Sequence, residues 1–112
     1  MNDPVRRHER FMRDDMPRRL GGIAADLARI GSFAPNPANR QAVLDLIEES
    51  KWFIEWVAPS VEPEVAARLA EMQVSLAVIE ARMRAGDVDV PALIQSASAW
   101  SSEVLEMSGL AR

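Results

Sequence analysis

The chain contains no cysteine and no tyrosine, and His8 is the only histidine among its 112 residues. Without cysteine it can form neither a disulfide nor a thiolate metal site. A single histidine excludes the metal motifs that need two histidine ligands, and it leaves no histidine beyond the N-terminus for Ser-His-Asp or Cys-His catalysis. We therefore expect a protein that is not an enzyme, with no catalytic residues, no bound metal and no cofactor.

Long apolar runs are missing as well. No segment approaches the ~20 apolar residues that a membrane-spanning helix needs, and the N-terminus, MNDPVRRHER, lacks the apolar core of a secretion signal. We expect a cytoplasmic protein without membrane contact. Hydrophobic residues make up 48% and charged residues 27% of the chain, which is typical of one globular domain.

Charge is distributed unevenly along the chain, although the net charge is only −4. Residues 1–40 carry eight arginines against five acids, whereas residues 41–112 carry five basic and twelve acidic residues. The basic excess lies between Arg6 and Arg19. We interpret residues 1–13 as a basic N-terminal arm, helical in part or not at all, and residues 14–112 as a single helical-bundle domain.

Apolar residues recur at intervals of three and four between the prolines and glycines, which indicates helices. Asp14 or Asp15, Asn36 and Asp89 are the expected N-caps, and Gly86 the expected left-handed C-cap. We predict no β-sheet and four helices, near residues 15–34, 37–58, 62–85 and 90–108. Because the connections are short, the predicted fold is all-α, an up-and-down antiparallel four-helix bundle with a basic N-terminal arm. Six side chains are expected in its core: Leu27, Ile47, Ile54, Leu69, Leu76 and Val104.

Two of these helices carry a second apolar face. In the 37–58 helix, Trp52 and Trp56 lie opposite the side that faces the core. The 62–85 helix has a second stripe of small and branched residues opposite its core-facing side. Isolated monomers rarely expose such a patch. We predict a non-enzymatic protein–protein interaction module, an adaptor or regulator, that forms a homodimer or binds another helical protein. The candidate interface residues are Trp52, Trp56, Ala67, Ala70, Val74, Val78 and Ala81.

Three alternatives stay open at this point. In the first, the N-terminal arm or the last helix covers one of the two faces. In the second, an apolar ligand or pigment binds beside the tryptophans. In the third, clustered arginines, with Phe11 among them, bind nucleic acid. The sequence pI of about 5.0 argues against nucleic acid. The arm is equally suited to the acidic surface of its own or a neighbouring subunit. The arginines concerned are Arg6, Arg7, Arg10, Arg13, Arg18 and Arg19.

Two stretches, LARIGSF (residues 27–33) and AVLDLIEESKWFIEWVAP (residues 42–59), resemble parts of a group of small all-helical cyanobacterial proteins with no known activity. The resemblance covers about a third of the chain and leaves out its arginine-rich start. It implies an all-α cytosolic protein and assigns no active-site residues.

Overall fold

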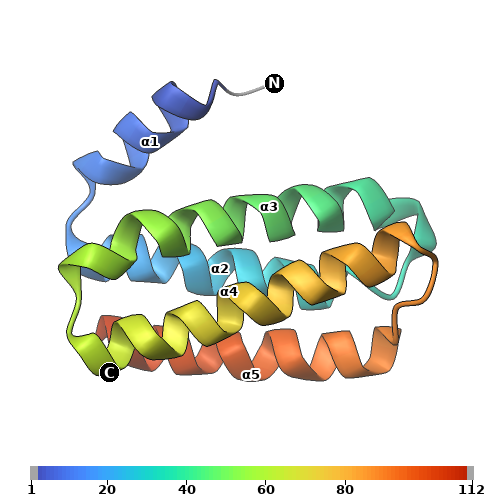
Figure 1. The fold of residues 1–112 in the computed structure, drawn as a ribbon. Coiled ribbons are helices and arrows are strands. Elements are labelled where there is room, and N and C mark those ends of the chain that lie inside the picture. The colour runs from blue at the N-terminus through green and yellow to red at the C-terminus, as the bar shows by residue number, and fades with distance from the viewer. Residues whose placement is uncertain (1–2, 111–112) are drawn as a thin grey trace.

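The computed structural model describes residues 3–110, which form five α-helices and, within that range, no strand. Four long helices lie side by side, with neighbours packed antiparallel, and the short first helix lies outside them (Figure 1). The second helix contacts the third and the fifth, and the third contacts the fourth. Residues 1–2 of the predicted arm and residues 111–112 of the predicted domain lie outside the described range. The helices are α1 (Pro4–Arg13), α2 (Met16–Phe33), α3 (Arg40–Val57), α4 (Pro63–Arg84) and α5 (Val90–Ser108).

The ends of α2–α5 follow the predicted capping signals. The Asp15 carboxylate accepts a hydrogen bond from the backbone N–H of Arg18 at 3.1 Å, and Asp89 caps α5 in the same way at 3.0 Å. Gly86, with φ of 73°, follows α4 in the left-handed conformation. Only the start of α3 differs by more than one residue, because residues 37–39 form a 3-10 turn, capped by Asn36, before the α-helix begins.

The prediction of four helices is short by one, because most of the presumed arm is helical. Asp3 accepts a hydrogen bond from the N–H of Val5 at 2.9 Å, and Pro4 occupies the first turn, where its missing N–H costs nothing. Phe11 is the only buried residue of α1, at 6% exposure. The helix is therefore largely polar and is attached to the bundle by very few apolar side chains.

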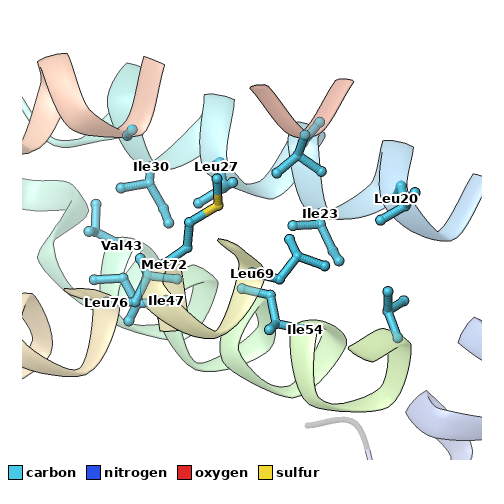
Figure 2. Close-up of a cluster of buried hydrophobic side chains, with 14 of the residues drawn as sticks. Leu20, Ile23, Leu27, Ile30, Val43, Ile47, Ile54, Leu69, Met72 and Leu76 are labelled. Carbon is cyan, nitrogen blue, oxygen red and sulfur yellow. The ribbon is translucent and has the colours of Figure 1, made fainter. Parts of the chain in front are cut away.

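The core lies between α2, α3, α4 and α5, where side chains from different helices point toward one another (Figure 2). All six residues predicted to be buried are in it, each at most 1% exposed. Helix α2 continues through Gly21 and Gly22 instead of beginning after them. At the edge of the bundle the missing side chain of Gly21 leaves room for Leu110, because a Cβ atom there would lie 2.9 Å from Cδ1 of Leu110.

Replacing Leu76 by alanine should lower the free energy of unfolding by about 2–5 kcal/mol, because Leu76 is fully buried and the shorter side chain leaves a cavity. Chemical denaturation followed by circular dichroism measures this. Val5→Ala is the control, since Val5 is 63% exposed and its loss should change stability by less than about 0.5 kcal/mol. Equal losses in both variants would contradict this assignment of the core.

Candidate interaction surface

Helix α4 is apolar on two opposite sides. One side contributes Leu69, Met72 and Leu76 to the core, all fully buried. The other faces outward and includes Val74 at 65% exposure and Val78 at 49%, two of the five large hydrophobic residues that are exposed between residues 3 and 110. The remaining residues of this side are exposed alanines: Ala67, Ala70, Ala77, Ala81 and Ala85. We call this outward side of α4 the outer face.

Polar contacts on both flanks hold α4 in this orientation. Toward α3, the Lys51 ammonium lies 2.7 Å from a carboxylate oxygen of Glu80, and the Gln73 amide donates to the Lys51 backbone oxygen at 2.9 Å. The hydrogen bond with Lys51 holds the pKa of Glu80 below its ordinary value. Toward α5, the Arg68 guanidinium donates two hydrogen bonds to the Glu103 carboxylate, at 2.6 and 3.0 Å. The outer face is therefore fixed away from the core.

The aromatic side of α3, in contrast, is covered by α1. The Phe11 ring stacks on Phe53 with a centroid distance of 4.3 Å, and the His8 ring meets Trp56 edge-on at 4.8 Å. The Arg7 guanidinium carbon lies 5.0 Å from the centre of the Trp52 ring, in cation–π geometry. Both tryptophans are half-buried. At Trp52 and Trp56, the structure therefore shows the alternative in which the N-terminal arm covers the apolar face.

A polar chain runs from α1 into the bundle beneath this aromatic contact. Arg7 Nε of α1 lies 3.9 Å from a carboxylate oxygen of Glu49 on α3. Glu49 adjoins Asp26 of α2, which is only 3% exposed and accepts a hydrogen bond from the Arg29 guanidinium at 3.2 Å. The acidic surface of the same chain thus receives the basic arm, one of the two arrangements that the sequence left open.

Burial, followed by hydrogen bonding to Glu49 and the negative charge of that neighbour, raises the pKa of Asp26 to about 8. Arg29 acts in the opposite direction, but its side chain is 59% exposed and water weakens its influence. The Asp26 Oδ2 atom has no hydrogen-bond donor among the described residues. A proton on this atom removes the charge and gives the Glu49 carboxylate a donor, which is why the neutral form is favoured at pH 7.

The six predicted nucleic-acid-binding arginines do not form one surface. Arg7 lies against Trp52 and Glu49, and Arg19 donates to the backbone oxygens of Met12, in the last turn of α1, and of Asp14, just after it. Arg18 is exposed on α2. The other three line one depression on α1, which they share with Glu9: Arg6, Arg10 and Arg13.

Two cavities bear on the predicted apolar ligand. The one beside Trp52 has a volume of about 350 Å³, but it is open and Lys51, Glu55 and Gln73 supply half of its lining, with Val74 and Ala77 on the α4 side. A more apolar cavity of about 260 Å³ lies at the opposite end of α3, between Val43, Met83 and Leu93. The tryptophans therefore do not line an enclosed apolar pocket, although Trp52 borders the outer face of α4.

Neither metal-binding clusters nor membrane spans are found among residues 3–110. No group of three or more histidine, aspartate or glutamate side chains there is arranged to hold an ion, and no helix is long and apolar enough to cross a membrane. Comparison of the chain with protein-family models, curated proteins and solved structures gave no match. The resemblance to the cyanobacterial group stays a prediction.

Sequence reasoning missed Asp26, the most deeply buried ionisable residue of the described range. The signal was its spacing: Asp26 is three residues after Ile23 and four before Ile30, so it shares their side of α2. An acid at that register faces α3 and not water. The periodicity places residue 26 on the buried side of α2, but a single acid among apolar residues does not change the helical pattern and so was not singled out.

Replacing Asp26 by asparagine should flatten the pH dependence of stability. The unfolded chain loses the Asp26 proton near pH 4 and the folded chain near pH 8, so the folded state binds more protons between these values and stability falls as pH rises. We expect the wild type to lose up to about 1.4 kcal/mol per pH unit between pH 5 and 7 relative to D26N. Urea unfolding at several pH values tests this, with Asp87→Asn as the control at an exposed acid. Parallel curves for the wild type and D26N would refute the assignment.

Replacing Phe11 by alanine should release α1 from α3, because it removes the stacked contact with Phe53. Trp52 and Trp56 then become accessible, so we expect tryptophan emission at longer wavelength and stronger quenching by acrylamide. Val5→Ala, at a 63% exposed position of the same helix, should leave both signals unchanged. Quenching equal to that of the wild type would mean that Phe11 does not hold α1 in place.

Proposed function

We propose that the chain is a non-enzymatic helical interaction module of the cytoplasm, an adaptor or regulator, in which α2–α5 form an up-and-down four-helix bundle that self-associates through the outer face of α4. The observation that carries this proposal is the exposure of Val74 and Val78 on a helix whose other side is fully packed. A second copy would bury both valines, and burial of apolar area is the main driving force of association.

The proposed interface is narrower than the one expected from the sequence. Trp56 packs beneath α1, and Trp52 lies under Arg7 of α1 and lines the cavity that it shares with Val74 and Ala77. The α4 residues of the predicted interface remain accessible. The tryptophans accordingly serve as anchors for the chain's own α1, and the partner meets α4.

The two alternative functions receive less support. Two of the six arginines are engaged inside the chain, and Glu9 lies among the three that cluster on α1. The cavity beside Trp52 is open and half of its lining residues are polar, which does not suit an apolar ligand. Binding to an oligonucleotide at ~50 mM salt, weakening steeply as salt is added, would instead favour the nucleic-acid function.

Replacing Val74 and Val78 together by glutamate should convert a dimer into a monomer, because the interface would have to bury two unpaired carboxylates. Sedimentation equilibrium should give half the wild-type mass, while circular dichroism shows unchanged helix content. The matched control is Ser98→Glu with Ser102→Glu, two exposed α5 positions that are also four residues apart. A wild-type chain that is monomeric at every accessible concentration overturns the proposal.

A further inference from the structure

The outer face of α4 is symmetric about its own midpoint. Six of its seven apolar residues read Ala, Ala, Val, Val, Ala, Ala along the helix, and at ~100° per residue they lie within about 40° of the direction of Val74, whereas Ala77 lies about 60° away on one flank. Counted from residue 76, each of the six has an equivalent at the same distance, to within one residue, on the other side. The pairs are Val74 with Val78, Ala70 with Ala81, and Ala67 with Ala85.

This pattern is what an antiparallel pair of identical helices requires. A two-fold axis that passes between the helices at residue 76 brings each residue opposite the partner residue at the same distance on the other side of position 76, so one patch is complementary to itself. Val74 then meets the partner's Val78, and the alanines on either side allow the helix backbones to approach closely. A stripe with its valines at one end would instead place each valine opposite an alanine, at both ends of the contact.

Charge on one flank of the outer face follows the same symmetry. Glu71 and Arg82 lie about 60° and 80° to the same side of Val74, and they are about 16 Å apart along the axis, too far to pair within one chain. Both are exposed; the Glu71 side chain is 70% accessible and has only a long contact of 3.9 Å to Arg68. Arg82 has no acidic partner within 4.0 Å among the described residues.

The two-fold axis that pairs the valines also brings Glu71 opposite the partner's Arg82, because the two residues are equally distant from residue 76 to within one residue. A parallel pair of helices places this flank against the opposite flank of the partner, where Gln73 supplies no charge near Glu71 and Arg84 places a like charge near Arg82. Hydrophobic pattern and charge pattern therefore select the same arrangement independently.

We propose that the partner of the outer face is a second copy of this chain, bound with α4 antiparallel to α4 about a two-fold axis near residue 76, with Val74 against Val78 and Glu71 against Arg82 of the partner. The inference rests on the proposed function and specifies its partner and register. Contact along a single helix buries less than a standard interface, so we expect dissociation in the micromolar range.

Reversing the charges tests the register. Glu71→Arg places two arginines opposite each other at both ends of the interface, and Arg82→Glu does the same with two glutamates; each single variant should dimerise about tenfold more weakly than the wild type at low salt. The double variant E71R/R82E restores opposite charges and should regain wild-type affinity. Sedimentation equilibrium at low and at 0.5 M salt measures these constants, with circular dichroism as the folding check.

Mixing the two single variants gives a second test that does not depend on the double variant. A heterodimer of E71R with R82E has opposite charges at both contacts, whereas each homodimer has like charges, so native mass spectrometry should show more heterodimer than the statistical half. A dimeric wild type whose variants form dimers equally well, or mix statistically, overturns the proposed register but leaves self-association standing. A monomeric wild type overturns the proposed function and this inference together.

Discussion

Helices α3 and α4 each have an apolar side opposite the core, and a helix with two apolar sides needs two packing partners. For α3 both are present in one chain: the bundle covers Ile47 and Ile54, and α1 covers Phe53 and Trp56. For α4 only the inner side is covered within the described residues. Because exposed apolar area attracts a partner, this difference between two neighbouring helices determines where α1 packs and which surface remains available.

The contact between α1 and α3 combines aromatic packing with charge. Phe11 supplies the buried apolar area, whereas Arg7 places a cation over Trp52 and near Glu49. Because its pKa is raised to about 8, Asp26 is neutral and does not repel the adjacent Glu49 carboxylate, which lies near Arg7. The buried Asp26 of α2, through its raised pKa, thus supports the contact between Glu49 of α3 and Arg7 of α1.

The fold could be predicted largely from the sequence because its determinants are local. The spacing of Leu69 and Leu76, the capping by Asp15 and the turn at Gly86 each depend on a few neighbouring residues. The path of α1 could not be predicted in this way. Its polar sequence hides the single anchor Phe11, and the partner of that anchor lies 42 residues further along the chain, at Phe53. Long-range contacts of one side chain leave no periodicity in a sequence.

The candidate surface shows the same division. Periodicity identified the outer face of α4, since Val74 and Val78 lie opposite Leu76 on any regular helix. Periodicity also assigned Trp52 and Trp56 to the same predicted interface, because α3, like α4, has an apolar side opposite the core. The structure separates them: Trp56 belongs to the contact with α1, and Trp52 borders both surfaces, beneath Arg7 on one side and beside Val74 and Ala77 on the other. The proposed partner on α4 would therefore meet Trp52, which contacts Arg7 of α1, so that the covered face of α3 helps to shape the open face of α4.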